Sequence, residues 1–118
     1  MHTRYTAHTR SLIEAVLNSS GETTPALRCA SEERSAQLSG RISSQANQVP
    51  PEIEGYLNKV ALHAYKITDQ DLEALRAAGY HEDAIFELTL SAALGAGLAR
   101  LECGLAALKG ERDAAQED

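Results

Sequence analysis

The chain has 118 residues, of which 43% are hydrophobic and only 4% aromatic, and this length allows one domain with a core of small aliphatic side chains. Its 17 acidic and 11 basic residues give a net charge of −6 without a basic cluster, which excludes nucleic-acid binding. The N-terminal residues lack the apolar segment of a signal peptide. The longest uncharged apolar run, residues 88–99, is shorter than the roughly 20 residues that span a bilayer. We therefore expect one cytoplasmic domain, residues 1–118, that binds no membrane.

The polar N-terminal part, residues 1–49, predicts two helices and a linker. Apolar side chains recur at helical spacing within residues 5–18, and turn-forming residues follow. Thr24 and Pro25 then match the N-cap and first position of a second helix, which ends near Ser39. The apolar stripe of this second helix is weak, and the linker-like stretch GRISSQANQVPP separates it from the apolar remainder of the chain.

The apolar body of the chain, residues 50–109, contains three further helical patterns. The first follows Pro50 and Pro51, and its apolar residues recur at intervals of three and four from Ile53 to Ile67. This spacing places them on one face and predicts a continuous amphipathic helix.

A short fourth helix is predicted between Thr68 and Gly79. Thr68 and Asp71 form a pair typical of a capping box, and Ile67 with Leu72 forms a hydrophobic staple around the same helix start. Gly79 suits the left-handed conformation that commonly follows the last turn of a helix. Both ends of this helix are therefore specified locally.

The fifth helix is the most apolar element and is predicted from His81 to Lys109, with acidic residues in its first turn and a basic residue in its last. Two apolar stripes run along it, one from Ile85 to Ala99 and the other from Phe86 to Leu105. A helix that is apolar on two faces is buried between neighbours. We expect one neighbour to be a second subunit, so that the protein is a homo-oligomer.

Small residues lie near the middle of this helix, at Gly95, Ala96 and Gly97. Glycine is unfavourable inside a helix by about 1 kcal/mol, so its presence favours a close approach of another backbone. We expect that contact at Gly97, on the second stripe. The charged residues 110–118 are predicted to be a frayed tail.

The layout of residues 53–108, a short helix that ends in LRAAGY and then a long small-residue helix, resembles the carboxymuconolactone decarboxylase and alkylhydroperoxidase AhpD-like superfamily. The resemblance implies an all-α fold of about five helices, with a long buried Ala/Gly-rich C-terminal helix, assembled as a trimer or hexamer. Redox-active members carry a Cys-x-x-Cys-x-x-x-His motif and an upstream Glu. Alignment on Ala78-Gly79 places Ala64 and Ile67 at the thiol positions and Asp71 at the His position, and only Glu52 matches. A degenerate member without the thiol pair would lack the usual peroxidase activity.

Glu52, Tyr56, Lys59 and His63 form a second, polar row on the predicted third helix. One interpretation is a proton-handling row in which His63 is a general base and Glu52 orients it. The alternative is a solvated helix face with ordinary side-chain pairs, and we favour it. If the family pocket is retained, we expect the catalytic residues to be Glu52, His63 and Tyr65.

The remaining reactive side chains give weaker signals. Cys29 and Cys103 have no ligand partner at zinc spacing, so no metal and no cofactor is predicted, and reduced thiols are expected. A lone peroxidatic role for Cys103 stays open. His81 is expected to be a helix-start residue, and Glu87 and Arg100 are expected to reach solvent at the ends of the apolar run.

Three classes of function therefore remain. The first is a cysteine-independent enzyme or small-ligand binder. The second is a non-catalytic oligomeric scaffold or partner protein, and the third is a one-cysteine peroxidase. Fold alone does not choose among them, because function depends on the site.

Overall fold

The computed structural model describes residues 3–42 and 48–117, with side chains for residues 6–42 and 48–110. Within these ranges the chain forms α-helices and one 3-10 turn, and no strand. The elements are α1 (Thr3–Asn18), α2 (Pro25–Leu38), α3 (Pro51–Leu62), η1 (Ala64–Lys66), α4 (Asp69–Ala77) and α5 (Glu82–Glu117). The predicted all-α fold with about five helices and a long C-terminal helix is confirmed.

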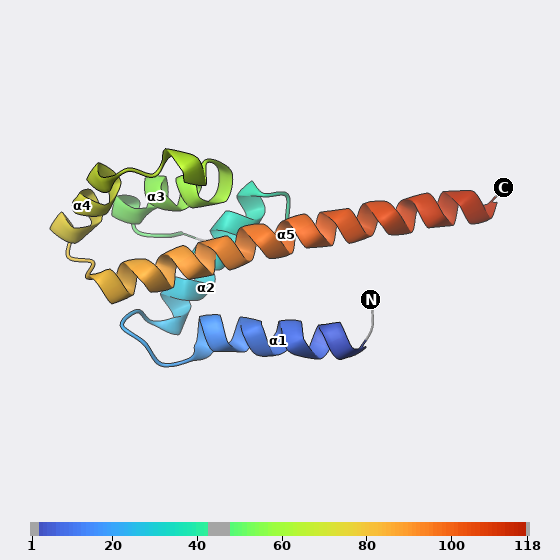
Figure 1. Ribbon diagram of the computed structural model, residues 1–118, viewed down its shortest axis with the longest axis horizontal. Helices are drawn as coiled ribbons and strands as arrows, with labels where there is room; N and C mark the ends of the chain where they lie inside the picture. The colour runs from blue at the N-terminus through green and yellow to red at the C-terminus, as the bar shows by residue number, and fades with distance from the viewer. Residues whose placement is uncertain (1–2, 43–47, 118) are drawn as a thin grey trace.

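Helix α5 forms the long axis of the molecule, whose extents are 59 × 27 × 26 Å. In Figure 1, α1 lies on one side of α5, α3 and α4 lie on the other side, and α2 crosses behind it. The contact between α2 and α5 is the most extensive in the fold. The C-terminal part of α5 continues past every other helix, so that this end of the molecule is a single projecting helix.

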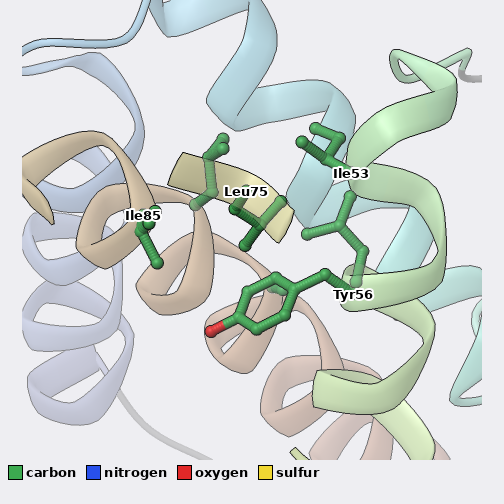
Figure 2. Close-up of a cluster of buried hydrophobic side chains, with 7 residues drawn as sticks. Ile53, Tyr56, Leu75 and Ile85 are labelled. Atoms are coloured by element: carbon green, nitrogen blue, oxygen red, sulfur yellow. The ribbon is translucent and has the colours of Figure 1, made fainter. Parts of the chain in front are cut away.

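The hydrophobic core lies where α3, α4 and the first half of α5 meet, as Figure 2 shows. Its members are Ile53, Tyr56, Leu57, Leu75, Ile85, Leu88 and Ala92. The Tyr56 hydroxyl lies 2.6 Å from the Thr89 hydroxyl, so the polar end of this buried ring is hydrogen-bonded. The first apolar stripe of α5 is thus buried, as predicted.

Helix α4 begins and ends as predicted. The Thr68 side chain accepts a hydrogen bond from the Asp71 backbone N–H, and the Asp71 carboxylate accepts one from the Thr68 N–H, which is a complete capping box. The helix ends before Gly79, whose φ of 101° lies in the left-handed region that favours glycine.

The prediction of one continuous helix from Ile53 to Ile67 is wrong. Helix α3 ends at Leu62, His63 leaves the helical conformation with φ −146° and ψ 53°, and η1 follows. At this end the Arg100 guanidinium of α5 donates a hydrogen bond of 2.5 Å to the Ala61 carbonyl. A side chain from a distant helix thus satisfies a carbonyl that the helix end leaves without an intrahelical partner.

Helix α2, which precedes the linker-like stretch, packs directly on α5 of the apolar body. The α2 residues that face α5 are small or polar, and Ser35 donates a hydrogen bond of 2.6 Å to the Ala92 carbonyl. A Cβ atom built on Gly95 would lie 2.1 Å from the Glu32 carbonyl oxygen. The close backbone contact is therefore at Gly95 and not at Gly97, which has nothing within 4 Å of a built Cβ.

The second apolar stripe of α5 was expected to be buried and is exposed in the single chain. Phe86 is 65% exposed and Leu108 is 58% exposed, and the side chains of residues 100–110 are all exposed. The helix also continues to Glu117, where a frayed tail from residue 110 was predicted. Helix α5 therefore has a first half with one buried face and a second half whose described side chains, those of residues 100–110, are exposed.

The segment Glu82–Gly110 of α5 is long and apolar enough to cross a membrane by length and composition. The core helices of soluble proteins pass the same test, and 44% of its most apolar window is buried within the fold. The length and composition of Glu82–Gly110 are therefore only weak evidence for a membrane span. This segment is nevertheless longer than the uncharged run of residues 88–99 considered from the sequence.

Candidate functional site

Glu52 lies at the start of α3 with an exposed side chain. Its carboxylate accepts a hydrogen bond of 3.0 Å from the Tyr80 hydroxyl. Burial raises the pKa of Tyr80, and the nearby Glu52 carboxylate adds to that shift. Glu52 thus pairs with a phenol from the segment between α4 and α5, and not with His63.

His63 and Tyr65 lie together at the opposite end of α3. Their rings meet edge to face with centroids 6.0 Å apart, and the Lys66 ammonium lies 5.8 Å from the centre of the Tyr65 ring. Both rings are exposed, Tyr65 by 81%. Eleven residues separate Glu52 from His63, which is about 16 Å along a helix. The structure brings His63 to Tyr65 but leaves Glu52 apart from both.

The three positions aligned with the redox motif fall on η1, on the residue after it and on α4. Ala64 is exposed on η1, and Ile67 packs at the edge of the hydrophobic core. Asp71 accepts a hydrogen bond of 2.8 Å from the Lys59 ammonium, and this bond lowers the pKa of the Asp71 carboxyl. Two charged residues of the site region therefore form an ion pair that ties α3 to α4.

The two cysteines lie apart in separate surroundings. Both are free, Cys29 is half-buried on α2, and Cys103 is exposed on α5. The Cys103 sulfur lies 3.7 Å from the Gly40 carbonyl oxygen. Among the described side chains no cluster of three His, Cys, Asp or Glu residues could hold a metal ion.

Arg28 is an important buried residue that the sequence pattern did not indicate. It is only 2% exposed, and its guanidinium donates hydrogen bonds to the backbone carbonyls of Val16, at 2.8 Å, and Ser19. The last turn of α1 contains no basic residue of its own. Arg28 thus supplies the positive charge that a helix C-terminus favours and holds α1 on α2.

Glu87 binds the loop that joins α1 to α2. Its carboxylate accepts hydrogen bonds from the Thr23 hydroxyl at 2.5 Å, from the Thr23 N–H at 2.8 Å and from the Glu22 N–H at 2.8 Å. The bond from the Thr23 hydroxyl is the largest cause of the lowered pKa of Glu87. The expectation that Glu87 simply reaches solvent is therefore wrong, and its role is to position the loop.

Arg41 joins α2 to the point where α5 leaves the rest of the fold. Its guanidinium forms ion pairs with Glu32 at 2.9 Å, Glu33 at 3.0 Å and Glu102 at 3.1 Å. Burial raises the pKa of Glu32, and the charge of Arg41 opposes this shift. The cluster therefore links α2 to α5, and its acidic side chains are already paired with Arg41.

The most distinctive surface is the exposed face of α5, defined by Phe86, Leu90, Leu101, Leu105 and Leu108. Two hollows border it on the side of α1. One of about 190 Å³ lies between Ile13, Arg10 and Leu101, and one of about 260 Å³ lies between Val16, Phe86 and Leu90. Several large exposed apolar side chains along one helix are typical of interaction sites.

Comparison of the chain with known proteins found no matching family model, no matching curated protein and no matching solved structure. The arrangement of its own side chains is therefore the basis for the proposals that follow.

Proposed function

We propose that this protein is a non-catalytic helical scaffold that acts by self-association. The observation that carries the proposal is the exposed face of α5, where leucine and phenylalanine side chains remain in water in the single chain. Burying apolar surface contributes about 25 cal/mol per Å², so a partner helix on this face would be stabilised by several large side chains at once.

The projecting half of α5 supports the same proposal. Residues 100–117 extend for about 27 Å at 1.5 Å per residue, and the described side chains among them, those of residues 100–110, are all exposed. Most helix stability in proteins comes from packing of an apolar face. Association with another chain would supply that packing.

The residues of the polar row on α3 lie apart from one another, and this favours a scaffold function over catalysis. A general base and the group that orients it must lie within hydrogen-bond reach of one another or of a bound substrate. Glu52 bonds to Tyr80, whereas His63 lies at the far end of α3. The catalytic assignment of Glu52, His63 and Tyr65 is therefore the weaker proposal.

The one-cysteine peroxidase has less support still. A reactive thiolate needs a positive neighbour, and the nearest basic residue in the sequence, Arg100, donates its hydrogen bond to the Ala61 carbonyl. We expect peroxide reduction with a dithiol donor to stay at background and to be unchanged by Cys103→Ser. A turnover abolished by that substitution would establish the thiol chemistry instead.

Small-ligand binding is a second candidate function, and the hollow of about 190 Å³ between α1 and α5 favours it. Its lining combines the apolar Ile13 and Leu101 with Arg10, whose guanidinium would contact an anionic group. Isothermal titration with medium-chain carboxylates checks this candidate. Saturable binding that Arg10→Ala weakens would support it, and no heat at millimolar ligand would exclude it.

Membership of the AhpD-like superfamily, as a member without the thiol pair, is part of the same proposal. The short helix α4 that ends at Gly79 and the buried small-residue stripe of α5 support it. We also propose a cytoplasmic location, because the buried first half of α5 accounts for much of its apolar character.

Sedimentation velocity across a range of protein concentrations tests the scaffold. We expect an oligomer at micromolar concentration, dissociation on Leu105→Lys, and no change on Leu62→Lys. The control residue Leu62 is also an exposed leucine, 46% against 37% for Leu105, but it lies at the end of α3 and away from the α5 face. A wild-type chain that stays monomeric throughout would refute the proposed function.

A further inference from the structure

Five leucines form a continuous seam along the second half of α5. Their successive spacings are 4, 3, 4 and 3 residues, which is the heptad spacing of two helices that wrap around each other. The first two are half-buried within the fold, and the last three are exposed on the projecting segment. The seam consists of Leu94, Leu98, Leu101, Leu105 and Leu108.

Glycines border this seam on one side, at Gly97 and Gly104, seven residues apart. Neither has an atom of the described residues within 4 Å of a built Cβ, so no contact with that part of the chain requires a glycine there. Gly95 shows that a glycine in α5 allows close helix packing, because the α2 backbone occupies the space that a side chain at this position would fill. Gly97 and Gly104 would allow a second helix to approach equally closely.

The seam continues into the hollow between α1 and α5. Leu101 lines this hollow together with Ile13, and Arg10 lies at its rim. Arg10 forms none of the ion pairs or hydrogen bonds found among the described side chains. An apolar seam with a free cation beside it fits an amphipathic helix that carries acidic residues next to its leucines.

The projecting end of α5 has this chemistry. Its seam leucines are followed by KGERDAAQED, which holds four acidic residues and two basic residues and therefore has a net charge of −2. We propose that a second copy of this chain covers the seam, with the two α5 helices antiparallel about a two-fold axis near residue 103. This inference rests on the proposed self-association and adds the partner, the orientation and the register.

An antiparallel pair is favoured over a parallel pair by charge. A parallel pair would set two segments of net charge −2 side by side, and like charges in contact are destabilising. The antiparallel pair instead places each acidic end against the α1 side of the other copy, whose Arg10 has no partner among the described side chains. Opposed helix dipoles add to this preference.

The seam is also self-complementary in this orientation. With the axis near residue 103, Leu98 packs on Leu108 of the second copy, and Leu101 packs on Leu105 of the second copy, each contact occurring twice. Gly104 then faces its own equivalent where the helices cross. The smallest side chain thus lies at the point of closest approach.

Disulfide cross-linking between introduced cysteines tests the orientation. In a Cys29→Ser, Cys103→Ser background, a mixture of Gly97→Cys and Glu111→Cys chains should cross-link to each other upon oxidation. Neither of these variants should cross-link to itself, whereas Gly104→Cys should. A Gly97→Cys chain that cross-links to itself while the mixture does not would overturn the antiparallel arrangement.

Distances between spin labels provide a second readout that leaves the seam unmodified. The exposed Ala93 lies outside the seam. Labels on Ala93→Cys, in the same background, should be about 30 Å apart in the antiparallel pair and about 10 Å apart in a parallel pair. Circular dichroism of each variant confirms that it remains folded.

Three other outcomes are distinguishable. An oligomer that Leu105→Lys and Leu108→Lys leave intact would keep the proposed function but overturn the seam as its interface. A monomer in solution at all concentrations would refute both. Flotation of that monomer with lipid vesicles, lost in Leu105→Lys, would show that a membrane surface covers the seam, which also overturns the inference.

Discussion

The two halves of α5 differ in environment far more than in composition. In the first half Leu88 and Ala92 are buried against α3 and α2, whereas in the second half Leu105 and Leu108 are exposed. Both halves combine leucine with alanine and glycine at helical spacing. The difference teaches that periodicity identifies an apolar stripe but not the surface that covers it.

The largest expected difference in stability is between two variants that each truncate one leucine, one in each half of α5. Leu88 is 1% exposed, so Leu88→Ala should lower the free energy of unfolding by about 2–5 kcal/mol. Leu105→Ala should cost less than about 1 kcal/mol in the monomer, because its side chain remains partly in water there.

Chemical denaturation at several protein concentrations separates the two effects. The loss in Leu88→Ala should be the same at every concentration, whereas the loss in Leu105→Ala should grow as the wild type associates. Equal losses at low concentration would mean that the second half of α5 is packed within the single chain.

Substitution of the two glycines near the middle of α5 should have smaller effects on stability, of opposite sign at the two positions. A Cβ at Gly95 would meet the Glu32 backbone oxygen, so Gly95→Ala should cost roughly 1–3 kcal/mol even though alanine is the better helix former. Gly97→Ala meets no atom and should instead gain up to about 1 kcal/mol. Thermal denaturation of both variants, at a concentration at which the wild type is monomeric, checks the opposite signs, and a loss in Gly97→Ala there would contradict the open space at that position.

The sequence correctly predicted the local structures that depend only on residues close together along the chain. The capping box of Thr68 and Asp71, the N-cap at Thr24 and the left-handed Gly79 were all predicted correctly. Each is a contact within a few residues along the chain, so the residue types alone specify it.

The sequence did not predict the features that depend on contacts between side chains far apart along the chain. The end of α3 coincides with a bond from Arg100, and α1 is held by a buried Arg28 from the next helix. The row from Glu52 to His63 required α3 to continue, and it does not. Small polar residues, Ser35 among them, hid the burial of α2, because a close helix contact needs little apolar surface.

Two serines on α2 and at its C-terminal end give a third test of about 1 kcal/mol. Ser35 is fully buried and bonds to the Ala92 carbonyl, so Ser35→Ala should lose about 1 kcal/mol. The Ser39 hydroxyl oxygen is buried without a partner among the described residues, so Ser39→Ala should be neutral or stabilising. Equal losses in chemical denaturation would indicate that helix propensity, and not the hydrogen bond, sets the effect.

The smallest expected effect concerns the pH dependence of the contact between α5 and the α1–α2 loop. Hydrogen bonds, first of all from the Thr23 hydroxyl, hold the pKa of Glu87 below its ordinary value of 4.5. A carboxyl whose pKa is lowered by folding stabilises the fold fully above that ordinary value. The stabilisation is lost as the pH falls through the lower, folded-state pKa.

Glu87→Gln should therefore lower the free energy of unfolding by less than about 1 kcal/mol at pH 7, and the difference from the wild type should shrink as the pH falls below 4.5. Glu14→Gln, at an exposed position on α1, is the matched control and should follow the wild type. Urea denaturation between pH 3 and pH 7 measures the three curves. A difference that stays constant down to pH 3 would mean that the loop is held by the shape of the Glu87 side chain and not by its charge.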